Sequence, residues 1–97
     1  MSDRYEVRLT PPAVRALHRL PARLADAVWR FLDEPLAHNP QRVTKPLGNE
    51  LAGLRGGYVG VAYRVLVSID NERRVVYVHR IARWPGAAAP SDSRPVP

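Results

Sequence analysis

The sequence contains no cysteine among its 97 residues. It can therefore form no disulfide framework and offers neither a thiolate zinc site nor a cysteine nucleophile. It also lacks a run of the ~18 apolar residues that a membrane-spanning helix needs, and its first residues lead into an alternating segment without the apolar stretch of a signal peptide. We therefore expect a cytoplasmic protein that is neither secreted nor inserted into a membrane.

Patterns typical of a metal site or of a hydrolase triad are also missing. The three histidines are far apart along the chain and are not accompanied by a pattern of carboxylates. We interpret each as structural, with His18 on the polar side of a helix, His38 before a loop and His79 directed at the helices. No Ser/His/Asp order and no glycine-rich phosphate loop stands out. The sequence thus predicts no metal and no cofactor.

Lysine is nearly absent although the chain is strongly basic. Lys45 is the only lysine among 15 basic residues, and these outweigh 9 acidic residues to give a net charge of +6. Such an excess attracts nucleic acid, anionic membranes or acidic proteins. The planar guanidinium of arginine matches phosphate oxygens, which favours phosphate recognition, although a GC-rich genome also raises the arginine content.

The first half of the chain has the pattern of a strand followed by a helical hairpin. Residues 5–9 alternate between apolar and polar positions, as in a half-buried strand. Thr10 then precedes two prolines, which is typical of a helix start, and apolar residues recur at helical spacing with a break at Pro21. The Asn-Pro pair at 39–40 is expected to close the helical part, and residues 41–53 are expected to form an ordered loop.

The second half has the pattern of antiparallel strands. Apolar and polar residues alternate over 63–69, turn residues follow at 70–72, and a second alternating run occupies 75–82. A weaker strand is expected over 54–61, where glycines permit a bulge or a sharp twist.

The last residues differ in composition from the rest of the chain. After Trp84 the sequence is rich in proline, alanine, serine and glycine. The length allows only one domain. We therefore expect a domain over residues 1–84 and a disordered tail over residues 85–97.

The order of these elements predicts an α+β fold with an N-terminal strand, a two-helix hairpin and then antiparallel strands. Two helices can cover only one face of the sheet, which leaves an open face. If Tyr63 and Val65 point at the helices, Arg64 lies on the open face, and the cost of burying Arg80 favours the same face for its side chain. The last strand would then direct Val75, Tyr77, His79 and Ile81 at the helices and Val76, Val78, Arg80, Ala82 and Trp84 outward. A basic open face with an aromatic residue at its edge is typical of a single-stranded RNA site.

Several short motifs, in their order and spacing, resemble the RelE/ParE toxin superfamily over residues 4–84. The resemblance implies a RelE-like toxin of a type II toxin–antitoxin system, which cuts mRNA in the ribosomal A site and is neutralised by a small antitoxin. ParE-like relatives instead inhibit DNA gyrase. The matching residues are Tyr5-Glu6-Val7, the run at 16–21, Asn39-Pro40, Lys45-Pro46-Leu47, the run at 51–54, Tyr63-Arg64-Val65-Leu66, Ile69-Asp70 and Arg80-Ile81-Ala82-Arg83.

The resemblance also implies candidate site residues. Metal-independent cleavage uses the 2′-hydroxyl to attack its own phosphate, which needs a base, an acid and stabilisation of the developing phosphorane charge. Arg64 follows the family's tyrosine, a position associated with phosphate stabilisation, and Arg80 and Arg83 are expected to complete the catalytic set. The candidate RNA-binding residues are Lys45, Arg55 and Trp84.

The sequence departs from the family at the end of the last strand. Relatives often have a His-Arg or Lys-Arg pair there and a tyrosine several residues later. Here Arg83 and Trp84 occupy the pair, and no aromatic residue or group that titrates near neutral pH follows. Losing a general acid or base costs ~10² to 10⁴ in rate, so reduced endoribonuclease activity is predicted.

Three functions stay open: an mRNA-cleaving toxin, a gyrase-directed or other non-nuclease toxin, and a catalytically weakened member that acts through antitoxin and operator binding. Plain structural roles stay open too, with Arg64 and Lys45 as ordinary strand or loop residues, Arg80 and Arg83 as solvated or antitoxin-contacting charges, and Trp84 as a packing residue. The expected partners are an acidic RelB-like antitoxin, the ribosome and mRNA, and operator DNA only through the antitoxin complex.

Overall fold

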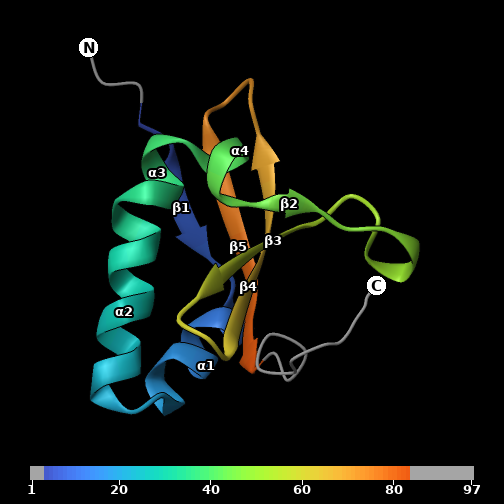
Figure 1. Cartoon of the computed structure of the whole chain (residues 1–97). Coiled ribbons are helices and arrows are strands. Elements are labelled where there is room, and N and C mark those ends of the chain that lie inside the picture. Colours follow the sequence, from blue (N-terminus) through green and yellow to red (C-terminus); the bar gives the residue numbers. More distant parts are fainter. Residues whose placement is uncertain (1–3, 84–97) are drawn as a thin grey trace.

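A computed structural model describes residues 4–83 and arranges them as a mixed sheet with helices packed on one of its faces (Figure 1). The sheet has five strands in the order β1-β5-β4-β3-β2, in which β1 runs parallel to β5 and the other neighbouring pairs are antiparallel. The α+β fold class predicted from the sequence is therefore confirmed. In chain order the elements are β1 (Glu6–Leu9), α1 (Pro11–Arg19), α2 (Ala22–Asp33), α3 (Pro35–His38), α4 (Pro40–Val43), β2 (Lys45–Pro46), the 3-10 helix η1 (Asn49–Leu51), β3 (Arg55–Val59), β4 (Tyr63–Asp70) and β5 (Val75–Arg83).

The two longer helices begin at the residues that the sequence indicates. The hydroxyl of Thr10 accepts a hydrogen bond from the Ala13 N–H at 3.4 Å, and Pro11 and Pro12 occupy the first positions of α1, where no N–H is needed. Pro21 immediately precedes α2. Among residues 4–83, none of the helices has both the length and the apolar character required to cross a membrane.

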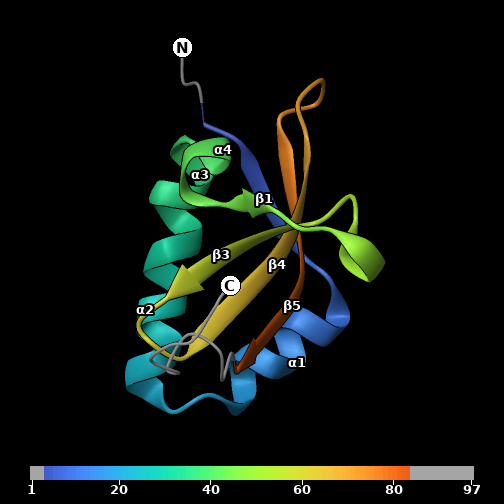
Figure 2. The ribbon, with the colours of Figure 1, turned by 45° about the vertical axis from the view of Figure 1, so that its right-hand side comes forward.

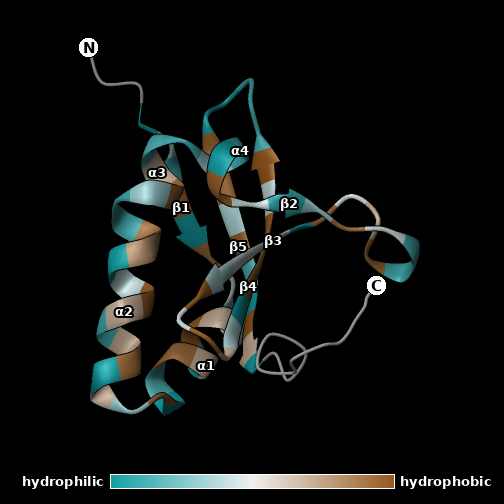
Figure 3. Cartoon of the chain, in the orientation of Figure 1, coloured by the Kyte–Doolittle hydropathy of each residue, from teal (hydrophilic) through white to brown (hydrophobic). Residues whose placement is uncertain are grey.

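The hydrophobic core lies between the helices and the sheet. Views that differ by 45° both place α2 alongside the sheet (Figure 2). Hydrophobic and hydrophilic stretches alternate along α2 (Figure 3). One side of the helix faces the core, so Val28 and Leu32 are buried, whereas Trp29 and Arg30 are exposed. Burying a valine or leucine side chain contributes about 1.5–3 kcal/mol, so this cluster dominates the stability. Its buried members are Ala13, Leu17, Val28, Leu32, Leu36, Val59, Val65, Val67, Val76, Val78 and Ile81.

The prediction that the Asn-Pro pair at 39–40 ends the helical part is wrong. Pro40 begins a further helical turn, α4, and the Asn39 side chain accepts a hydrogen bond from the Arg42 N–H at 3.3 Å. A proline stops a helix only in its interior, because at the first position its missing N–H and fixed φ are compatible with helix. The expected loop over 41–53 also contains β2, which pairs with β3, and η1.

Two adjacent glycines of β3 distinguish the faces of the sheet. A Cβ added at Gly57 would meet the Phe31 ring of α2, whereas one added at Gly56 would meet Cδ of Arg64 and the Leu47 side chain at 3.5 Å. Since side chains alternate along a strand, Arg64 points away from α2. We call this side the open face. By strand register it carries Glu6, Arg8, Tyr58, Arg64, Leu66, Ser68, Tyr77, Arg80 and Ala82.

Strand β5 contains one extra residue relative to β4. Leu66 pairs with Arg80 but Val67 pairs with Val78, so His79 is inserted between the two pairs as a β-bulge. An inserted residue shifts the alternation by one position. The two halves of β5 therefore direct side chains of opposite parity toward the core.

The predicted faces of β5 are consequently wrong before the bulge and correct after it. Val76 and Val78, expected to point outward, are fully buried in the core. Tyr77, expected to face the helices, lies on the open face. Beyond the bulge, Ile81 is in the core and Arg80 is exposed, as predicted.

Packing of β3 against α2 requires glycine at position 57. In the Gly57→Ala variant, the new Cβ would lie 2.7 Å from Cζ of Phe31 and 3.2 Å from Cγ2 of Thr44. Overpacking of this kind costs about 1–3 kcal/mol, which we expect as a loss of unfolding free energy in urea denaturation.

Gly48→Ala is the matched control, because nothing lies within 4 Å of an added Cβ at that position and its φ of −120° suits any residue. We expect its stability to be unchanged or slightly raised. Equal stabilities of Gly57→Ala and Gly48→Ala would refute the close packing of β3 on α2.

Candidate nucleic-acid interface

The open face carries two arginines on the neighbouring strands β4 and β5. Arg64 of β4 pairs with Ala82 of β5, and Arg80 pairs with Leu66 in the next row. Arg64 and Arg80 are thus diagonal neighbours, about 7–8 Å apart at their Cα atoms. The Arg64 side chain passes over Gly56, because a Cβ built at that position would lie 3.5 Å from Cδ of Arg64.

Lys45 lies in the same row of residues paired across the strands as Arg80, whereas the Arg55 side chain is not on the open face. Lys45 of β2 pairs with Gly56, which pairs in turn with Leu66, and this register places the exposed Lys45 on the open face. Arg55 shares the parity of Gly57 and therefore turns toward the helices.

The guanidinium of Arg55 is engaged at the end of α4. It donates to the Thr44 hydroxyl at 2.8 Å, to the Thr44 carbonyl at 3.0 Å and to the Gln41 carbonyl at 3.1 Å. Thr44 is buried and its hydroxyl also donates to the Pro40 carbonyl. These bonds satisfy carbonyls at the end of a short helix, so the structure gives Arg55 a structural environment.

The other two candidates are separated from Arg64 and Arg80. Arg83 pairs with Tyr63 at the end of β5, and this register places it on the side opposite Arg64, where it is exposed. Trp84 lies outside the residues that the structure describes. The structure therefore makes Arg64 and Arg80 neighbours and places Lys45 on the same face, two strands away from Arg64.

A histidine that the sequence placed toward the helices lies instead at the polar end of the open face. The Nε2 of His79 is 2.8 Å from the Ser68 hydroxyl, and its ring centroid is 6.5 Å from that of Tyr77. Its carbonyl accepts a hydrogen bond from the Thr10 hydroxyl at 3.1 Å. Strict alternation along β5 predicted the opposite orientation for His79, because it does not include the bulge that brings the ring to Ser68.

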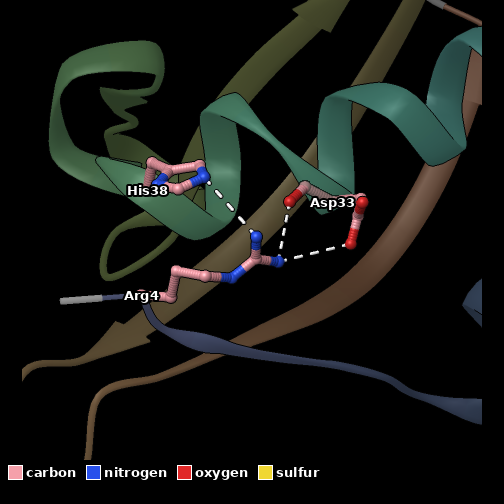
Figure 4. A network of polar contacts seen from close by, with 3 residues as sticks. All are labelled: Arg4, Asp33 and His38. Carbon is pink, nitrogen blue, oxygen red and sulfur yellow. Dashed lines mark hydrogen bonds and ion pairs between the residues drawn. The ribbon is translucent and has the colours of Figure 1, made fainter. Parts of the chain in front are cut away.

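The remaining two histidines lie elsewhere. His18 is exposed on α1, and Nε2 of His38 lies 3.5 Å from the Arg4 guanidinium (Figure 4). Arg4 also donates to the carbonyl of Asp33 at 2.9 Å and to its carboxylate at 3.3 Å, which ties the start of β1 to the end of α2.

Within residues 4–83 no three His, Cys, Asp or Glu side chains are grouped so that they could hold a metal ion.

The charge at the β1 edge of the open face is neutralised internally. Arg8 donates to the Glu6 carboxylate at 2.8 Å and 3.2 Å. The hydrogen bond from Arg8 and its positive charge lower the pKa of Glu6, and Glu6 in turn raises the pKa of Arg8. The positive potential of the face is therefore concentrated toward Arg64 and Arg80.

Comparison with known proteins identifies close relatives of this chain. It is 40% identical to Toxin RelE of Mycobacterium tuberculosis over 91 residues, which cover 94% of this chain and 93% of the relative. It is 44% identical to Toxin RelG of the same organism over 77 residues, which cover 79% and 87% of the two chains. No family model matches the sequence.

Solved structures show the same fold. The toxin–antitoxin complex RelBE2 from Mycobacterium tuberculosis contains a chain that matches with a TM-score of 0.78 and 42% identity, covering 82% of this chain and 98% of that one. The isolated RelE toxin of Escherichia coli matches with a TM-score of 0.67 at 17% identity, covering 82% and 84% of the two chains. The second match supports the fold alone.

The Glu6–Arg8 pair can be tested by titration. In the Arg8→Gln variant, Glu6 loses its hydrogen bond and the neighbouring positive charge, so we expect its pKa to rise toward the ordinary value in an NMR pH titration. Because the pKa of Glu6 is lowered in the folded protein, the ion pair contributes stability at pH values above the ordinary carboxyl pKa. This contribution is lost as the pH falls through the lowered pKa. Because both side chains are exposed, the change in stability should be small.

Arg73→Gln is the control for this titration, since it removes an exposed arginine that pairs with another carboxylate, the half-buried Asp70 at the end of β4. It should leave the Glu6 pKa unchanged. Identical Glu6 titrations in the wild type and in Arg8→Gln would contradict the assignment.

Proposed function

Because the chain belongs to the RelE family of toxins, we propose that it is the toxin of a type II toxin–antitoxin pair and cleaves mRNA on the ribosome. The observation that carries this proposal is the diagonal pair Arg64 and Arg80 on an open sheet face, with Lys45 in the same row as Arg80. Such a face can bind the backbone of a single strand while its bases remain accessible for pairing or stacking.

Arg64 is the proposed catalytic residue. When the 2′-hydroxyl attacks the adjacent phosphate, negative charge accumulates on the phosphorane oxygens, and a fixed guanidinium stabilises that charge more than it stabilises the ground state. Arg64 is partly buried and held beside Gly56, so it is better positioned than an arginine on an exposed loop. Arg80 would bind the neighbouring phosphate.

We propose that the cleavage is slow compared with that of complete relatives. The family's terminal tyrosine is missing, and tryptophan occupies position 84, where an arginine is usual. The reaction would then depend on positioning of mRNA by the ribosome and on charge stabilisation by Arg64. Trp84 would contribute by stacking on a base. Arg83 would contact RNA or the antitoxin rather than the phosphate beside Arg64.

The test of the proposed function is single-turnover mRNA cleavage on programmed ribosomes. We expect Arg64→Ala to lower the cleavage rate by ~10² or more, because one lost transition-state contact of this kind costs ~2.7–4 kcal/mol. Arg64→Lys should recover part of the rate, since it keeps the charge but loses the planar fork. The matched control is Arg23→Ala, an exposed arginine of α2 away from the open face.

Each outcome decides between functions, provided that circular dichroism shows a folded variant. A normal rate in Arg64→Ala would remove Arg64 from the site. No cleavage by the wild-type protein would refute the proposed activity. It would favour a catalytically weakened toxin that acts through antitoxin and operator binding, an alternative that the missing tyrosine supports. Inhibition of DNA gyrase in place of cleavage would favour the ParE-like alternative.

We further propose an acidic RelB-like antitoxin as the cognate partner, acting in the cytoplasm, with operator DNA bound only through the complex. Related structures are described as complexes of RelE with RelB, including one from Pyrococcus horikoshii with 25% identity to this chain and a TM-score of 0.60. A groove of about 310 Å³ beside β1 supports this proposal, because its lining offers the apolar Val7 and Leu9 and the half-exposed Trp29 for burial. The lining also contains the charged residues Arg4, Glu6 and Asp33. An antitoxin segment could cover this groove while its carboxylates reach the basic open face.

Co-purification with the protein of the adjacent reading frame tests the partner. We expect a stable complex at micromolar concentration, weakened by Trp29→Ala because a half-exposed aromatic side chain would be buried on binding. Val61→Ala, at a more exposed apolar residue on the β3–β4 turn, is the control and should bind normally. Absence of any complex with the wild-type protein would contradict the proposal.

A further inference from the structure

We propose that Arg15, Arg19 and Arg80 form a second phosphate-binding site, which extends the RNA path from the open face around the edge of β5 onto α1. The inference rests on the proposed function only in taking RNA as the ligand. It concerns binding along the strand and assigns no step of the cleavage reaction to α1.

The three arginines line one cavity of about 270 Å³ between α1 and β5. Both ribbon views place α1 beside the C-terminal part of β5, beyond the end of β1 (Figures 1 and 2). Arg15 and Arg19 are four residues apart and therefore lie on the same side of α1. Pro12, Ala16 and Ile81 complete the lining and carry no charge.

The charges around this cavity are not balanced by the part of the chain that the structure describes. No acidic residue lines the cavity, and within residues 4–83 no ion pair involves Arg15, Arg19 or Arg80. Arg8 and Arg73, by contrast, each have a carboxylate partner. Like charges at positions i and i+4 destabilise a helix. A bound anion would relieve this repulsion.

Phosphate groups of RNA fit this site better than an isolated anion, because Arg80 is shared with the open face. Arg80 lies diagonally from Arg64 on one side and contributes to the cavity with Arg15 and Arg19 on the other. A ligand that occupies both places needs successive anionic groups along a flexible chain, as in single-stranded RNA. Guanidinium groups also match phosphate oxygens with two parallel hydrogen bonds.

The experiment measures binding of a short single-stranded RNA to the full chain, without ribosomes, at several salt concentrations. We expect Arg15→Gln/Arg19→Gln to weaken binding by about tenfold or more, because the charge-assisted hydrogen bonds of two guanidinium groups to phosphate are lost. The slope of log K against log salt should fall by about 0.7 for each lost phosphate contact. Arg15→Lys/Arg19→Lys should keep most of the salt slope but bind less tightly than wild type, because the charge remains and the fork is lost.

Arg23→Gln/Arg30→Gln is the matched control, since it removes two exposed arginines of α2 and changes the net charge equally. It should leave the affinity close to that of wild type. Equal affinity and salt slope in the two double variants would overturn the proposal, because only the overall charge would then matter.

Two further probes separate other ligands. If Arg15→Gln/Arg19→Gln loses binding of polyglutamate but binds RNA normally, the cavity serves an acidic protein and the proposal fails. If only binding of inorganic phosphate is lost, the site holds a free anion, and the proposal fails as well. A wild-type protein that does not cleave on ribosomes would refute the proposed function, whereas this binding measurement would still decide the role of Arg15 and Arg19.

Discussion

The β-bulge at His79 is the local constraint on which both faces of this sheet depend. Without the inserted residue, strict alternation would direct Arg80 to the same side as Val78, into the core. An unpaired buried guanidinium costs several kcal/mol, more than a local distortion of one strand. The bulge allows Val78 to complete the core and Arg80 to reach the open face.

Hydrogen bonds from two neighbouring elements hold the bulge. The Thr10 hydroxyl donates to the His79 carbonyl and the Thr10 N–H to the Val78 carbonyl, while Ser68 contacts the His79 ring. Thr10 also accepts the hydrogen bond from Ala13 that begins α1. One residue therefore links the bulge of β5 to the first turn of α1. This explains how arginines from a helix and from a strand come to line a common cavity.

Local patterns in the sequence were sufficient for the longer helices and strands, but not for α4, β2 and η1 or for every face. The half-buried strand near Tyr5, the helix start at Thr10 and the strand from Tyr63 all depend on neighbouring residues, and all three are confirmed. A bulge breaks the period without a distinctive residue, so the faces before His79 could not be predicted. Arg55 illustrates a second limit, because its environment depends on the carbonyls of α4, which no spacing in β3 reveals.

The position of the positive charge matters more than its amount. Arg4, Arg8 and Arg73 have carboxylate partners at the edges and the turn of the sheet, which reduces their contribution to the long-range field. Arg80 has no such partner within residues 4–83, and it stands between Arg64 and the arginines of α1. The two proposed phosphate sites therefore meet at Arg80, in the C-terminal half of β5. The bulge at which β5 departs from regular alternation thus also determines which face carries Arg80.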